Sequence, residues 1–180
     1  MKALLDACVL YPTVLREVLI GVAKAGLYTP LWSDRILEEW ARATVKLGPG
    51  AEDVARGEIA ALRLAFPTAA VPRREALENR LWLPDPADTH VLAAAIAGHA
   101  DLIVTFNATD FPKRLLAEEG LRREDPDAFL LGLWRDNPQA VADVAEAVRS
   151  EASRLSGETQ LLRPLLKRAR LPRLAKALTV

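Results

Sequence analysis

Acidic and amide side chains follow two short apolar runs of this 180-residue chain. Asp6 comes directly after the apolar run 3–5, and Asn107 and Asp110 follow the largely apolar run 102–106. In a parallel α/β sheet the ligand crevice lies beyond the carboxyl ends of the strands, so residues at these positions face it. An unpaired carboxylate is costly to bury there unless it holds a cation. The pattern predicts a metal site whose ligands are all oxygen atoms.

Acids beside expected helix boundaries are further candidates for this site. Asp85 is placed as an N-cap and Pro86 as the first residue of a helix, with Asp88 in the first turn, where a helix N-terminus stabilises negative charge. The cap accounts fully for Asp85, which we interpret as a cap rather than a ligand. Asp88, and likewise Asp110 before the expected helix 112–119, fits a helix start and a metal ligand equally well.

Glu38 and Glu39 are adjacent on the expected helix 34–47. Their side chains point about 100° apart, so only one of them can face the site. Ile36 and Trp40 share a face with Glu39. This favours Glu39 over Glu38 as the ligand.

Strand and helix signals alternate over the first two thirds of the chain. Strands are expected at 2–9, 27–32, 69–71 and 102–106, and helices at 12–26, 34–47, 51–66 and 86–98. That alternation is typical of a parallel sheet with helices on both faces. Beyond Phe111 only helices are expected, at 112–119, 126–135 and 138–155, followed by a basic segment broken by prolines. We predict a three-layer α/β/α domain with a short parallel sheet over residues 1–123, followed by a helical C-terminal extension over residues 124–180.

The composition is that of a folded, helix-rich protein, with 51% hydrophobic residues. No apolar run approaches the roughly 20 residues that span a bilayer, and Asp6 interrupts the apolar core that a signal peptide would need. The single cysteine, Cys8, excludes an internal disulfide, and its apolar surroundings favour a small buried residue over a nucleophile. We expect a cytoplasmic protein with no membrane partner.

The charge is unevenly distributed, although the formal net charge is zero. Residues 151–180 hold 7 Lys and Arg against 2 Asp and Glu. Such a basic segment either contacts phosphates or is simply a solvated surface. The expected helix 138–155 carries an apolar stripe, which packs either on the domain itself or on another chain.

Four motifs in this order and at this spacing resemble a PIN domain over roughly residues 1–115. They are Leu4-Leu5-Asp6, Glu38-Glu39 after Ser33, Asp85-Pro-Ala-Asp88-Thr-His-Val-Leu-Ala-Ala-Ala, and Ile103-Val-Thr-Phe-Asn107-Ala-Thr-Asp110-Phe111. The resemblance implies an Mg²⁺- or Mn²⁺-dependent endoribonuclease that hydrolyses RNA phosphodiester bonds, most often the toxin of a bacterial VapC-type toxin–antitoxin pair. It also implies a small antitoxin as a partner. The C-terminal extension is left to bind antitoxin, to grip RNA or to form a homodimer.

The resemblance also assigns residues to the site. By position, Asp6 matches the first acid of the family, Glu39 the helical glutamate, Asp88 the third acid, and Asn107 or Asp110 the fourth position. All five are implied as metal ligands, and the four acids among them as catalytic residues. Asn107 departs from the pattern, because many PIN domains have Asp there. An amide oxygen still ligates Mg²⁺, but the lost negative charge weakens metal binding unless Asp110 supplies it.

Other functions remain to be weighed against the nuclease. The Asn107 departure keeps open a PIN-like protein with an impaired site, which acts by binding RNA or a protein partner. A phosphatase with Asp6 as nucleophile is disfavoured, because haloacid-dehalogenase-like enzymes have a second acid two residues later, where this chain has Cys8. Zinc is disfavoured too, since His90 and His99 lack a further ligand at the spacing of a zinc site.

Overall fold

The computed structural model describes residues 1–179, which form two compact units. The sheet unit comprises Met1–Tyr11 and Thr29–Glu124. The helical unit comprises Pro12–Tyr28 and the chain from Asp125 onward. A segment from near the N-terminus thus shares a unit with the C-terminal helices.

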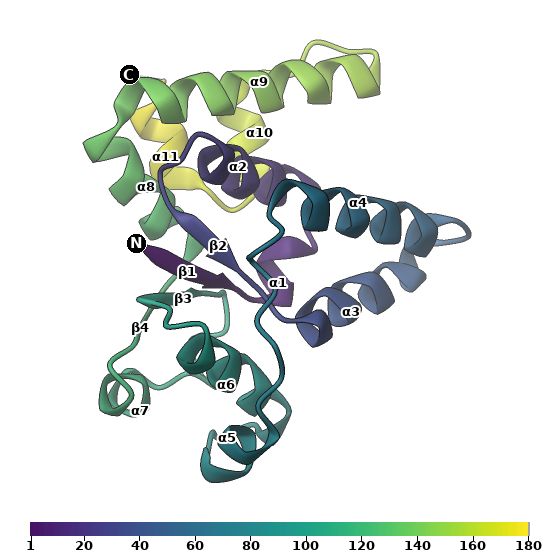
Figure 1. Cartoon of the computed structure of the whole chain (residues 1–180). Coiled ribbons are helices and arrows are strands. Elements are labelled where there is room, and N and C mark those ends of the chain that lie inside the picture. The colour runs from purple at the N-terminus through teal and green to yellow at the C-terminus, as the bar shows by residue number, and fades with distance from the viewer. Residues whose placement is uncertain (180) are drawn as a thin grey trace. The chain divides into compact units, whose positions relative to one another are not determined.

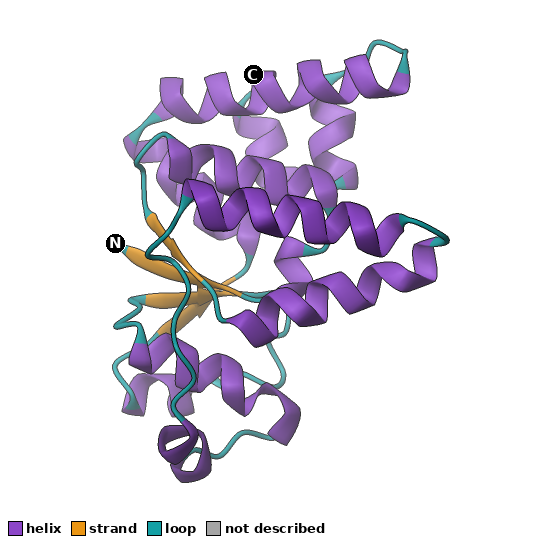
Figure 2. Cartoon of the chain, turned by 45° about the vertical axis from the view of Figure 1, so that its right-hand side comes forward, coloured by secondary structure: helices purple, strands orange, loops and turns teal. Residues whose placement is uncertain are grey.

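The sheet unit is built on four parallel strands in the order β2-β1-β3-β4, drawn in orange in Figure 2. The strands are β1 (Lys2–Leu5), β2 (Thr29–Leu31), β3 (Leu102–Val104) and β4 (Arg122–Glu124). Leu5 pairs with Val104, so β1 and β3 end side by side. Both strands are central in the sheet, and Leu5 and Val104 are apolar and fully buried, as expected of parallel strands that are covered on both faces.

All four expected strands are shorter than predicted, and two of them are much shorter. Strand β1 ends at Leu5 and not at residue 9, because Asp6 caps a short helix, α1 (Ala7–Leu10), by accepting a hydrogen bond from the Ala7 N–H at 2.7 Å. The expected strand 69–71 is reduced to a single parallel bridge between Trp32 and Ala70. In both places the apolar run continues after the strand pairing has stopped.

Two elements were missed. The prediction that only helices follow Phe111 is wrong, because β4 adds an edge strand that accepts a hydrogen bond from the Thr105 N–H at the Glu124 carbonyl. Strand β4 is entirely charged and therefore carries no apolar signal. Helix α5 (Glu75–Arg80) buries none of its residues, so it has no apolar stripe to reveal it.

The remaining helices of the sheet unit follow the expected signals, and Figure 1 shows their arrangement. They are α3 (Asp34–Ala43), the 3₁₀ helix η1 (Thr44–Leu47), α4 (Ala51–Ala65), the 3₁₀ helix η2 (Pro86–Asp88), α6 (Thr89–Ala97) and α7 (Lys113–Glu118). The expected cap Ser33 accepts a hydrogen bond from the Ile36 N–H at 3.2 Å. Helix α6 packs against β1, and α3 packs against α1 and α4. The predicted α/β/α class, with a short parallel sheet and a helical C-terminal region, is confirmed.

The helical unit gathers five helices around an apolar core. They are α2 (Thr13–Lys24), α8 (Pro126–Asp136), α9 (Pro138–Ser156), α10 (Leu162–Arg168) and α11 (Pro172–Ala177). Helix α2 packs on α9, and Asp127 of α8 accepts hydrogen bonds from the backbone N–H groups of Arg173 and Leu174 at 2.9 Å. Val141 and Ala145 of α9 are fully buried, so the first part of the apolar stripe of this helix packs within its own chain, whereas Leu155 near the end of the helix is 68% exposed.

Across residues 1–179 there is no helix that combines the length and the apolar character needed to cross a membrane.

Candidate metal centre

Asp6 stands at the carboxyl end of β1 and is only 7% exposed. Its Oδ1 accepts a hydrogen bond from the Ala7 N–H, and its Oδ2 accepts one from the Thr105 hydroxyl at 2.7 Å. The Cys8 thiol approaches the same Oδ2 at 3.3 Å. All three donors are uncharged groups, so neutral hydrogen bonds fix the orientation of this carboxylate.

Thr105 links Asp6 to the loop that follows β3. Its hydroxyl donates to Asp6 and accepts a hydrogen bond from the Asn107 N–H at 3.0 Å. Thr105 is itself 3% exposed, so these bonds form away from water. The pairing of β1 with β3 therefore brings residues 99 positions apart into one hydrogen-bonded group.

Asn107 continues this group toward two more acids. Its side-chain N–H donates to Asp88 Oδ2 at 3.0 Å, and its Oδ1 accepts from the Asp110 N–H at 3.2 Å. The amide orientation follows from these two partners. Asn107 thus holds Asp88 beside the loop that carries Asp110.

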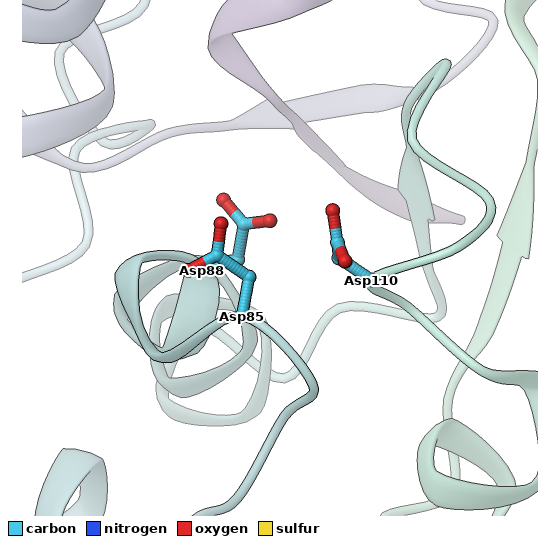
Figure 3. A group of neighbouring side chains, drawn as sticks. All are labelled: Asp85, Asp88 and Asp110. Carbon is cyan, nitrogen blue, oxygen red and sulfur yellow. The ribbon is translucent and has the colours of Figure 1, made fainter.

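Three carboxylates converge at the start of η2, as Figure 3 shows. Asp85, Asp88 and Asp110 each offer an oxygen, and these atoms lie within 4.8 Å of one another. Asp85 caps η2 as predicted, accepting from the Ala87 N–H at 2.9 Å. It also belongs to the acidic group, which the cap interpretation did not include. The separation of three residues between Asp85 and Asp88 was the available signal, because such residues share one side of a helical turn.

Crowding among these acids changes the protonation of Asp88. Partial burial, and then the negative charges of Asp6, Asp85 and Asp110, raise its pKa to about 6. The neighbouring His90 acts weakly in the other direction. A divalent cation would relieve this repulsion, since it favours the ionised form of every carboxylate around it.

Cys8 has no chemical role that the site requires. Burial, and then the charge of Asp6, raise the pKa of its thiol to about 12. The sulfur also accepts a hydrogen bond from the Phe106 N–H at 3.4 Å. A neutral thiol of this kind is a packing residue and a weak donor, and not a nucleophile.

Glu39 lies outside the group of three carboxylates. Its Oε1 is 2.8 Å from His90 Nε2 and 3.3 Å from Arg35 Nε. Burial opposes ionisation of Glu39, but the interactions with His90 and Arg35 outweigh it and lower the pKa. His90 lies two residues after Asp88, so Glu39 is tied to helix α6, which directly follows the η2 turn that carries Asp88. Nothing in the sequence indicated this contact, which depends on how α3 and α6 meet in space.

Glu38 is engaged on the outer side of α3. It pairs with Arg56 at 2.8 Å and with Arg42 at 2.8 Å. Hydrogen bonds from Arg56, and then from Arg42, lower its pKa to about 2. These partners favour Glu39 over Glu38 as the glutamate of the site, which stays a prediction.

The donor set fits a hard divalent cation. All candidate ligands are oxygen atoms, the type that Mg²⁺ and Mn²⁺ prefer. Oxygen ligands of one Mg²⁺ lie at most about 4 Å apart, given bond lengths of about 2.1 Å. The candidate oxygens of Asp85, Asp88 and Asp110 lie within 4.8 Å of one another, close to that limit.

Comparison with known proteins agrees with this geometry. The family model described as PIN domain matches residues 2–109, which is more than half of the chain. The matched range includes Asp6, Glu39, Asp88 and Asn107, and it ends one residue before Asp110. No curated protein and no solved structure matches the chain. The chain belongs to the PIN-domain family.

Proposed function

We propose that this protein is a divalent-metal-dependent endoribonuclease and the toxin of a type II toxin–antitoxin pair. PIN-family membership indicates a nuclease-type hydrolase. The observation that carries the proposal is the convergence of Asp85, Asp88 and Asp110 within 4.8 Å, with the pKa of Asp88 raised. Carboxylates that repel one another favour binding of a divalent cation, and that cation can in turn hold a phosphodiester.

The residues divide into those that hold the cation and those that orient them. Asp6, Asp85, Asp88 and Asp110 would hold it, with Glu39 as a further oxygen donor, whereas Asn107, whose Oδ1 accepts from the Asp110 N–H, would orient them. Bound Mg²⁺ or Mn²⁺ supplies Lewis-acid polarisation of the phosphodiester and lowers the pKa of nearby water. Hydrolysis joins a water oxygen to phosphorus and breaks a bond from phosphorus to a ribose oxygen, which leaves with a proton.

Thr105 and Asn107 are positioning residues in this proposal. The Thr105 hydroxyl keeps one face of the Asp6 carboxylate fixed, and the Asn107 amide does the same for Asp88. Carboxylates fixed before substrate arrives need little reorganisation during the reaction. Buried Ala3, Leu4 and Leu5 of β1 anchor the backbone from which Asp6 projects.

Asn107 favours a second candidate, a PIN-domain protein that binds RNA or a protein partner without cutting. Both ends of its amide are occupied by Asp88 and Asp110, and it brings no negative charge of its own. A site with one carboxylate fewer binds a dication more weakly. Metal binding and cleavage separate the two candidates.

The test is cleavage of a mixed pool of structured RNAs by the purified protein with Mg²⁺ or Mn²⁺. We expect cutting that EDTA abolishes and that Asp6→Asn reduces by at least about a hundredfold, because the substitution removes one charge from the proposed ligands. Asp53→Asn, an exposed change on α4, is the matched control and should cut like the unaltered protein. Folded protein, free of any copurified partner, that does not cut with either metal would favour the binding protein instead.

A further inference from the structure

A cavity of about 350 Å³ lies in the sheet unit beside the acidic group. One part of its lining is apolar and consists of Val71, Pro72, Ala93 and Ala94. Another part is charged, and none of the three clustered aspartates belongs to the lining. The volume is at the small end of the range for small-molecule sites, about 300–1,000 Å³, which suits a ligand the size of one nucleotide.

The charged part of the lining contains three arginines and two acids, Asp34 and Glu78. Both acids are paired, Asp34 with Arg63 at 3.1 Å and Glu78 with Arg73, whereas one of the arginines has no acidic partner in the described part of the chain. Arg73 pairs with Glu78 at 2.9 Å, and Arg35 pairs with Glu39 at 3.3 Å. Arg74 is exposed and has no acidic partner among residues 1–179. A guanidinium in this state keeps all its donors available for a phosphate.

A buried side chain with an unused ring nitrogen also lines the cavity. His90 is 5% exposed, and its Nδ1 has no hydrogen-bond partner among the described residues. Its Nε2 lies 2.8 Å from Glu39 Oε1, so Glu39 engages that nitrogen. Buried polar atoms are nearly always paired, so the unpaired Nδ1 in a cavity wall indicates a place for a ligand group.

The N-terminus of α3 contributes to the same cavity through Ser33 and Arg35. The first N–H groups of a helix carry partial positive charge and favour anions. Together with Arg74 they provide anion-binding groups in a cavity that also has an apolar lining, which matches the two chemical halves of a nucleotide.

We propose that this cavity binds one nucleotide of the RNA next to the bond that is cut. Its phosphate lies on Arg74 and the α3 N-terminus, its base packs on Val71, Pro72 and Ala93, and a polar group of the base meets the His90 ring. His90 joins the cavity to the acidic group, because it contacts Glu39 and follows Asp88 by two residues. This inference rests on the proposed function, which supplies the RNA.

The test is calorimetric titration of the full-length protein with the four nucleoside 5′-monophosphates in EDTA, so that no metal bridges them to the acids. We expect saturable binding that Arg74→Ala weakens about tenfold through loss of a charge-assisted hydrogen bond. Arg114→Ala should leave the affinity unchanged, since its side chain is 91% exposed on α7 and does not line the cavity. Inorganic phosphate alone should bind at least about tenfold more weakly than a nucleotide, because it lacks the base.

Several results would overturn the inference. These are no binding of any monophosphate at millimolar concentration by folded protein, phosphate binding as tightly as the nucleotides, or an equal loss in Arg74→Ala and Arg114→Ala. The proposed function can fail separately from this inference. If nucleotides bind in a way that depends on Arg74 but the protein cuts no RNA, the nucleotide site stands and the nuclease function is wrong. If the protein cuts RNA but binds no nucleotide, the nuclease function stands and the nucleotide site is wrong.

Discussion

Asp88 combines a local role with a collective one. It occupies the N-cap position of α6, directly before Thr89, and the negative charges of Asp6, Asp85 and Asp110 repel its carboxylate. The pKa of about 6 means that, near neutral pH, folding forces a charge into an unfavourable place. In the metal-free protein this group therefore favours function over stability.

The pH dependence of stability should reveal this. The folded pKa of Asp88 is above its ordinary value of 3.8, so its stabilising contribution is complete at low pH and is lost as the pH rises through about 6. In EDTA we expect Asp88→Asn to raise the Tm at about pH 7.5 and to leave it unchanged at about pH 4. Thermal unfolding followed by circular dichroism measures both.

Added metal should reverse that order. Mg²⁺ or Mn²⁺ should raise the Tm of the unaltered protein at neutral pH and raise that of Asp88→Asn much less, because ligand binding to the folded state stabilises it. Equal Tm values in EDTA at neutral pH would show that the carboxylates do not repel one another as their spacing implies. Asp53→Asn controls for the loss of a surface charge.

At the scale of elements, the parallel pairing of β1 with β3 makes the site. It places Thr105 beside Asp6, and the hydroxyl serves Asp6 and Asn107 at once. Thr105→Val keeps the shape and removes the hydroxyl, leaving the buried Asp6 Oδ2 with only the weak Cys8 thiol as a donor. We expect a loss of about 1–3 kcal/mol in the free energy of unfolding, measured with urea.

Thr105→Ser is the matched control for that change. It retains the hydroxyl and should recover most of the lost stability, whereas a similar loss in both variants would assign the effect to the missing methyl group. Metal affinity should follow the same order, because the Asp6 carboxylate loses one of the hydrogen bonds that hold it in place.

Elements with an apolar pattern or a capping residue could be predicted from the sequence, and these include β1, β3, α3 and the start of η2. Strand β4 could not, since Arg122–Glu124 are strand only because an open edge of β3 lies beside them. The site was partly predictable for the same reason. Acids that directly follow an apolar strand can be recognised in the sequence. The contact of His90 with Glu39 cannot, because it forms where two helices meet in space.

At the scale of the whole molecule, two units share one chain in an interleaved order. No composition change marks Pro12–Tyr28 as part of the helical unit, because membership depends on packing against helices that come much later. Helices α2 and α9 pack closely at Gly21, where an added Cβ would overlap a Val144 methyl.

This approach gives a prediction whose sign changes with the background. Gly21→Ala alone should destabilise the protein by about 1–3 kcal/mol, because the extra methyl overpacks the contact. In a Val144→Ala background the same change should stabilise by up to about 1 kcal/mol, since alanine has the better helix propensity. Urea unfolding of all four proteins measures this cycle, and the same sign in both backgrounds would contradict the packing of α2 on α9.

The interleaving also has a consequence for synthesis on the ribosome. More than a hundred residues separate helix α2 from its packing partner α9, and all of them are synthesised after α2. At a translation rate of about 5–20 residues per second, its apolar face waits roughly 5–25 s for that partner. The nascent chain can assemble all four strands before the helical unit is complete. A transcript or chain cut short near residue 124 would therefore release a protein with all four strands but with the apolar face of α2 exposed. We expect such a product to aggregate or to be degraded rather than to be active.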